Sequence, residues 1–171
     1  VGSMADLDLK NSLREMAIEL GKEIAKNNAV LVFGFEGDFE SLSSIAATEA
    51  EKAGGETLAF TCGSTKPHFK NLDSINIVTG QQRGGGREFS LILSCDAIIS
   101  ISGGSGTLME IAMAYQAGIP VVALKSSSGW SEKLSNKFLD ERKRKKVIAT
   151  NNPQESVKFA LRLAKKALKN L

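Results

Sequence analysis

Residues 96–124 read DAIISISGGSGTLMEIAMAYQAGIPVVAL and decide the fold of this chain. An apolar run ends at a glycine-rich turn, a helical pattern follows, and a second run of β-branched residues resumes after Gly118. Apolar runs without polar alternation are typical of strands buried on both faces, and a helix between two such strands is the crossover of a parallel sheet. The glycines are therefore predicted at the carboxyl end of a strand, where α/β sheets bind ligands.

The rest of the chain repeats this alternation of helices and strands. We expect helices over residues 9–27, 39–53, 87–95, 105–117, 130–138 and 153–169. We expect strands over residues 29–35, 56–62, 75–78, 96–101, 119–122 and 147–150, of which the strand that begins at Asp96 is the central one. The pattern predicts an α/β fold with a mainly parallel sheet of about five or six strands and helices on both faces.

Length and composition fit one domain over residues 4–171. The chain has 171 residues with 42% hydrophobic content, enough for one core, and no linker-like stretch divides it. Val1, Gly2 and Ser3 precede Met4 and are interpreted as a remnant of cloning. No apolar run reaches the ~20 residues that span a bilayer, and no charged-then-apolar leader is present. We therefore expect a cytoplasmic protein without a membrane partner.

The formal net charge is +3, which is too small to imply a nucleic-acid partner. The basic run at residues 142–146 directly follows Asp140 and Glu141, so we interpret it as a solvated surface turn and not as a patch that tracks phosphates.

The two cysteines, Cys62 and Cys95, lie far apart in sequence and beside apolar runs. They are interpreted as small buried hydrophobic residues in a reducing compartment, not as a disulfide. Because His68 is the only histidine, we expect no metal site.

The glycine-rich turn is the candidate binding site, and its residues are Ser102, Gly103, Gly104, Ser105, Gly106 and Thr107. Such a turn leaves backbone N–H groups at a helix N-terminus, where the helix dipole favours an anion such as phosphate. The alternative is a tight turn without a ligand, for which fewer glycines would suffice. The turn is not a P-loop, because no Gly-Lys-Ser/Thr follows, and Met109 stands where the dinucleotide fingerprint needs its last glycine.

These residues also carry a family resemblance. Residues 102–110, SGGSGTLME, with Arg87 fifteen residues before Ser102, resemble the P-G-G-x-G-T-x-x-E motif of the Lonely Guy family, often labelled lysine decarboxylase-like. The chain is most similar to the molybdenum-cofactor-carrier-like branch. The resemblance implies a Rossmann-like three-layer sandwich that here lacks the usual first strand, a nucleotide-like ligand, no required cofactor, and a homodimer or dimer of dimers. Lysine decarboxylation with pyridoxal phosphate has no support in the sequence.

Two functions follow from the resemblance. The first is binding or carriage of a nucleotide or pterin-type ligand, held by its phosphate at residues 102–107. The second is hydrolysis of a nucleoside 5'-monophosphate to free base and ribose 5-phosphate, with Arg87 and Glu110 as the catalytic pair. The carboxylate would stabilise an oxocarbenium-like transition state, and the guanidinium would hold an anionic group or the departing base. A third reading is an assembly subunit that has lost its ligand.

Arg87 and Glu110 could each have a purely structural role instead of a catalytic one. Glu110 could be a helix residue stabilised by the dipole, and Arg87 an exposed residue paired with Glu88. Departures from the hydrolase pattern favour binding over catalysis: the first strand and its loop are absent, Glu88 replaces a lysine, and Ser102 replaces a proline. In addition, two carboxylates in the turn at residues 34–38 would repel a nearby phosphate.

Overall fold

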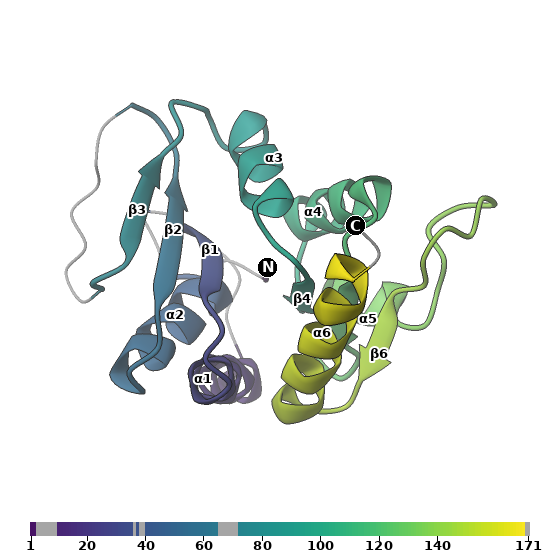
Figure 1. Ribbon diagram of the computed structural model, residues 1–171, viewed down its shortest axis with the longest axis horizontal. Helices are drawn as coiled ribbons and strands as arrows, with labels where there is room; N and C mark the ends of the chain where they lie inside the picture. The colour runs from purple at the N-terminus through teal and green to yellow at the C-terminus, as the bar shows by residue number, and fades with distance from the viewer. Residues whose placement is uncertain (3–9, 36, 38–39, 65–71, 170–171) are drawn as a thin grey trace. The chain divides into compact units, whose positions relative to one another are not determined.

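The structure is a computed structural model that describes residues 1–2, 10–35, 37, 40–64 and 72–169. Helices and strands alternate along the chain, as expected (Figure 1). The chain divides into two compact units, one formed by Ser3–Leu91 and the other by Val1–Gly2 with Ile92–Leu171. His68, Glu36 and Asp38 lie outside the described residues.

The unit of Ser3–Leu91 contains three parallel strands in the order β1-β2-β3. Its elements are α1 (Asn11–Lys26), β1 (Leu31–Phe35), α2 (Leu42–Lys52), β2 (Thr57–Thr61), β3 (Ile75–Val78) and the first part of α3 (Gly86–Leu93). Helices α1 and α2 pack so closely that a Cβ atom on Gly21 would overlap the carbonyl of Ala46. Only glycine fits at this crossing.

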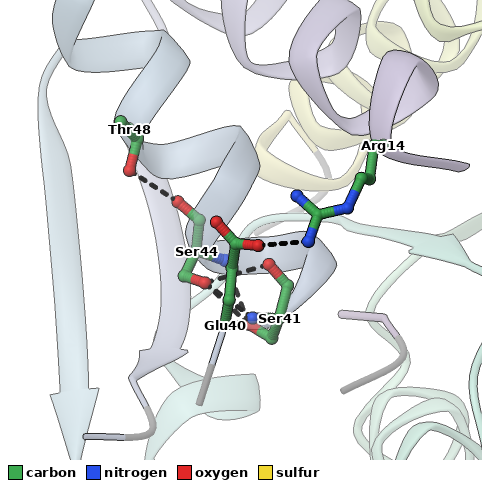
Figure 2. Close-up of polar contacts among 5 residues, drawn as sticks. All are labelled: Arg14, Glu40, Ser41, Ser44 and Thr48. Carbon is green, nitrogen blue, oxygen red and sulfur yellow. Dashed lines mark hydrogen bonds and ion pairs between the residues drawn. The ribbon is translucent and has the colours of Figure 1, made fainter. Parts of the chain in front are cut away.

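Helix α2 begins at an N-terminus that its own side chains close (Figure 2). Ser41 Oγ accepts a hydrogen bond from Ser44 N at 3.1 Å, and Ser44 Oγ accepts one from Ser41 N at 2.8 Å. This reciprocal pair is a capping box. Just before it, the Glu40 carboxylate accepts from Arg14 of α1 at 2.5 Å, so the start of α2 is also tied to the neighbouring helix.

The second unit contains another set of three parallel strands, in the order β4-β5-β6. Its elements are β4 (Ile98–Ile101), α4 (Ser105–Ala117), β5 (Val121–Leu124), α5 (Gly129–Leu134), β6 (Ile148–Thr150) and α6 (Pro153–Leu168). All four residues of β5 are buried. Within this set β5 is the middle strand, because it pairs with β4 on one edge and with β6 on the other.

The free edge of β4 is paired with the start of the chain. The Val1 ammonium donates to the Ile99 carbonyl at 2.9 Å, the Ile101 N–H donates to the Val1 carbonyl at 3.1 Å, and Gly2 forms a parallel bridge with Ile101. Two of the three residues that the sequence interpretation set aside therefore extend this sheet. No strand longer than this bridge precedes α1 in the described part of the chain.

Several finer expectations are corrected. Within the described residues, hydrogen bonds join the six strands into two parallel sets of three. Helix α5 ends at Leu134 and not at residue 138, because Ser135 leaves the helical region and Asn136 has a φ of 59°. Cys62 and Cys95 are half-buried and unbridged. The predicted start of α6 is confirmed: the Asn152 side chain accepts from Glu155 N at 2.8 Å.

Candidate ligand-binding site

The turn between β4 and α4 contains two residues in the left-handed backbone region. Ser102 has a φ of 54° and Gly103 a φ of 101°. A Cβ atom on Gly103 would overlap the side chain of Thr107, which is buried. Position 103 therefore requires glycine both for its conformation and for its packing.

A second segment of the same unit holds this turn in place through contacts with its main chain. The N–H of Ser102 donates to Ser127 Oγ at 2.7 Å, and its carbonyl accepts from Ser131 N at 3.0 Å and from Ser131 Oγ at 2.6 Å. The carbonyl of Gly103 accepts from Trp130 N at 2.9 Å. The glycine-rich turn is thus fixed by the start of α5.

The contact between the two segments is close enough to require a second glycine. Gly129 has a φ of 62°, and a Cβ atom there would lie 2.5 Å from the Gly103 carbonyl oxygen. Sequence reasoning missed this segment. A signal was present, however: the small residues 126–129 follow β5, and adjacent parallel strands end at the same edge of a sheet.

The exposed part of the turn faces away from these contacts. Gly104, Ser105 and Gly106 are exposed, and Leu108 N makes the first helical hydrogen bond, to the Gly104 carbonyl. The backbone N–H groups of residues 105–107 donate to no other group in the described part of the chain, and Gly104 caps α4 without a side chain. Three donors at the positive end of a 13-residue helix are therefore available to an anion.

Neither packing nor a positive φ explains two of the three glycines in the turn. Around Gly104 and Gly106, no atom lies within 4 Å of where a Cβ would stand, and neither residue has a positive φ. Alanine would fit at both positions. The absence of side chains there leaves the main chain open to close approach from solvent.

Glu110 lies on α4 one turn after Thr107 and is half-buried. Burial raises the pKa of the Cys95 thiol to about 11, with smaller contributions from the negative charges of Asp96 and Glu110. Cys95 is thus a neutral thiol at neutral pH.

Arg87 belongs to the unit of Ser3–Leu91, whereas the glycine-rich turn and Glu110 belong to the other unit. Its guanidinium is buried and donates twice to one Glu88 oxygen, at 3.0 and 2.6 Å. It also lies against β1, because a Cβ on Gly34 would be 2.8 Å from Arg87 Nη1. The sequence suggested, as an alternative to catalysis, an exposed Arg87 paired with Glu88. The pairing is present, but the expected exposure was wrong.

Burial of the Glu88 carboxyl raises its pKa, but the hydrogen bonds and positive charge of Arg87 outweigh this effect. The net pKa of Glu88 is lowered, and the two side chains form a buried ion pair.

Among the described residues, no group of three His, Cys, Asp or Glu side chains could hold a metal ion. In the same residues, no helix is long and apolar enough to cross a membrane.

With this geometry defined, comparison with known proteins gives the family. The model of the SLOG cluster4 family matches residues 1–157. The chain belongs to the SLOG cluster4 family. An uncharacterized protein of Archaeoglobus fulgidus is 33% identical over 112 residues, which cover 64% of this chain and 69% of that protein.

Solved structures of the same type support the fold. TM1055, a structural-genomics target, has a TM-score of 0.81 and 25% identity over 95% of this chain and 96% of its own. The molybdenum cofactor carrier protein of Chlamydomonas reinhardtii has a TM-score of 0.77 and 28% identity over 96% of this chain and 95% of its own. The Rossmann-like α/β three-layer fold and the resemblance to the carrier-like branch of the Lonely Guy superfamily are confirmed.

Proposed function

We propose that this protein binds a small phosphate-bearing ligand, a nucleotide or a pterin-type molecule, at Ser102, Gly103, Gly104, Ser105, Gly106 and Thr107. The observation that carries the proposal is the exposed start of α4, where three N–H groups have no acceptor in the described chain and two glycines have no role in packing. A phosphate at this position would accept from these donors, with the hydroxyl of Ser105 as a further donor. Similarity to a molybdenum cofactor carrier supports carriage of such a ligand.

Trp130 gives the ligand a second point of contact. Its main chain is bonded to Gly103, its ring is half-buried, and Lys133 Nζ lies 4.8 Å from the ring centroid. An indole and an ammonium beside a phosphate site suit an anionic ligand with a flat heterocycle. We therefore favour nucleotides and pterins over simple sugar phosphates.

The protein itself supplies the probe for a test, because Trp130 is the only tryptophan. We would titrate AMP, GMP, a phosphorylated pterin and inorganic phosphate while recording tryptophan fluorescence and thermal unfolding. A ligand at one hundred times its dissociation constant is expected to stabilise the folded state by about 2.7 kcal/mol. Absence of both a thermal shift and a fluorescence change with every probe would overturn the proposal.

Hydrolysis of a nucleoside 5'-monophosphate is the alternative outcome of the same experiment. It would use Glu110 at the turn and Arg87, which also pairs with Glu88, as the anion holder. Chromatographic detection of free base that disappears in Glu110→Gln, with binding retained, would establish hydrolysis. Retained ligand without free base would leave carriage as the function.

We also propose that the chain self-associates. Phe89 and Leu93 are 53% and 61% exposed and stand four residues apart on α3, on the same side of the helix. Two large apolar side chains on one short helix suit a contact between copies. Light scattering at micromolar concentration is expected to give at least a dimer, and a monomeric mass would exclude it.

A further inference from the structure

The formal charge of +3 conceals two units of opposite charge. The unit of Val1–Gly2 and Ile92–Leu171 carries 13 Lys and Arg against 6 Asp and Glu, a net charge of +7. The unit of Ser3–Leu91 carries 9 against 13, a net charge of −4. The expectation of no nucleic-acid partner rests on the charge of the whole chain, so it does not address the basic unit taken by itself.

The basic run at residues 142–146 accounts for part of this charge, and its contacts give it a structural role. Arg142 Nε donates to the Asp140 carboxylate at 2.7 Å, and Lys145 Nζ donates to the carbonyl of Gly118 at the end of α4. A cation at a helix C-terminus is favoured by the dipole. These charges therefore help to fix the loop onto α4.

The remaining positive charge is concentrated on α6, in a set of five side chains that we call the α6 stripe. Its members are Lys158, Arg162, Lys165, Lys166 and Lys169. Intervals of three and four residues place them on one face of the helix, and all five are exposed. None forms an ion pair with a described residue, although Arg162 lies 4.2 Å from the ring centroid of Phe159.

Helix α1 is an internal comparison for this stripe. It also has 16 residues and an apolar face, but it carries three glutamates beside its three basic residues. Each of these basic residues is paired with a carboxylate: Arg14 with Glu40, Lys22 with Glu49 and Lys26 with Glu23. The dipole favours Lys165 and Lys166 in the last turn of α6, but like charges at intervals of four residues destabilise a helix by about 0.2–0.5 kcal/mol per pair. Helix stability therefore does not explain Lys158 and Arg162, which lie before the last turn.

We propose that the α6 stripe binds the phosphate backbone of double-stranded nucleic acid without reading its sequence. Protein interfaces have an apolar, often aromatic centre and are depleted in lysine, whereas this stripe is mostly lysine. The apolar side of α6, with Val157, Ala160 and Ala164, is buried in the unit and is not available to insert into a lipid surface. The ring of Phe159 is covered by Arg162, which leaves the stripe without a platform for unstacked bases and favours a duplex over a single strand.

The dimensions agree with this partner. The stripe extends over about 16 Å, from Lys158 to Lys169 at ~1.5 Å per residue. Duplex nucleic acid carries one negative charge per ~1.7 Å of its axis. Several phosphates therefore lie within reach of the five cations, and this site is independent of the ligand proposed for the glycine-rich turn.

The test measures binding of the full chain to a labelled duplex of arbitrary sequence over a series of salt concentrations. Release of counterions by five phosphate contacts is expected to give a slope of log K against log salt of about −4 to −5. The variant Lys158→Gln, Arg162→Gln, Lys165→Gln is expected to reduce that slope by about 3. Its thermal unfolding midpoint is expected to equal or slightly exceed that of the parent chain, because repulsion between like charges is removed.

A matched control removes the same number of charges from the other unit. The variant Lys22→Gln, Lys26→Gln, Lys52→Gln changes three exposed lysines that are paired with glutamates, and it is expected to bind the duplex as the parent does. Equal losses in both variants would show a diffuse charge effect and overturn the proposal. So would no binding at low salt, or tighter binding to polyglutamate or to vesicles of anionic lipid than to the duplex.

Discussion

Helices α2 and α4 both begin after a parallel strand, but their N-termini are capped differently. At α2, Ser41 and Ser44 cap each other's main chain and Glu40 pairs with Arg14 (Figure 2). At α4, the cap is Gly104, which has no side chain to contribute. A helix start needs acceptors for its first N–H groups, and only α2 supplies them from its own side chains.

This difference separates the structural helix start from the candidate site. The turn before α4 is not loosely built, because its carbonyls accept hydrogen bonds from the start of α5. The turn is thus rigid on the side that faces the protein and open on the side that faces solvent. Rigid positioning of open donors is what a binding site for an anion requires.

The largest effect is expected from Gly103→Ala, which tests the rigid side of the α4 turn. The new Cβ would overlap Thr107 and occupy a backbone conformation with a φ of 101°. We expect a loss of roughly 2–4 kcal/mol of unfolding free energy, measured by denaturant titration. Gly106→Ala is the control, because open space surrounds that position. An unchanged stability in Gly103→Ala would mean that the turn is not rigid.

Gly104→Val tests the open side of the same turn. A side chain there meets no protein atom within 4 Å, but glycine is favoured over valine at a helix N-cap, so unfolding without ligand is expected to lose at most about 1 kcal/mol. The stabilisation by ligand, about 2.7 kcal/mol at one hundred times the dissociation constant, is expected to vanish. Gly37→Val in the turn before α2 is the matched control, because it too has open surroundings. A full ligand shift in Gly104→Val would place the ligand elsewhere.

A smaller effect is expected from Ser41→Ala, which opens the α2 cap. Loss of a serine cap costs about 1 kcal/mol, seen as a lower unfolding midpoint at an unchanged denaturant slope. Phosphate probes are expected to stabilise this variant as much as the parent chain. If Ser41→Ala were stabilised more by phosphate probes than the parent chain, any uncapped helix N-terminus would bind phosphate. The proposed difference between α2 and α4 would then be wrong.

The smallest effect is expected from pH, at a third helix start. Glu88 accepts from Gly85 N at 3.0 Å and closes α3, while it pairs with Arg87. Because its folded pKa is lowered from the ordinary 4.5, its contribution is present above that value and is lost as pH falls through the folded pKa. Stability measured between pH 7 and pH 3 is expected to fall less in Glu88→Gln than in the parent. Parallel pH profiles would contradict this assignment.

Sequence patterns predicted every helix and strand of the fold, because apolar runs and glycine punctuation are local signals. They also predicted the turn after β4, since several glycines at a strand end have a direct physical meaning. The order of the strands was harder to obtain. The middle position of β5 follows from its pairing with both β4 and β6, and no residue of β5 itself encodes those partners.

The candidate site was only partly predictable for a related reason. The contacts of Ser127 and Trp130 with the glycine-rich turn join residues about 25 positions apart, and on the side of the turn they use only main-chain groups, which carry no residue-specific pattern. Burial of Arg87 was missed because a charged residue next to a glutamate reads as an exposed pair. It is the missing side chain at Gly34 that makes room for the guanidinium on β1.

The hydrogen bonds from the start of α5 to Ser102 and Gly103 also have a kinetic consequence. A turn that is already held in one conformation has little backbone entropy left to lose when a ligand arrives. Association is then expected to follow a single exponential whose rate rises linearly with ligand concentration, without a slow closing step. Stopped-flow mixing, followed by the fluorescence of Trp130, would report that rate directly.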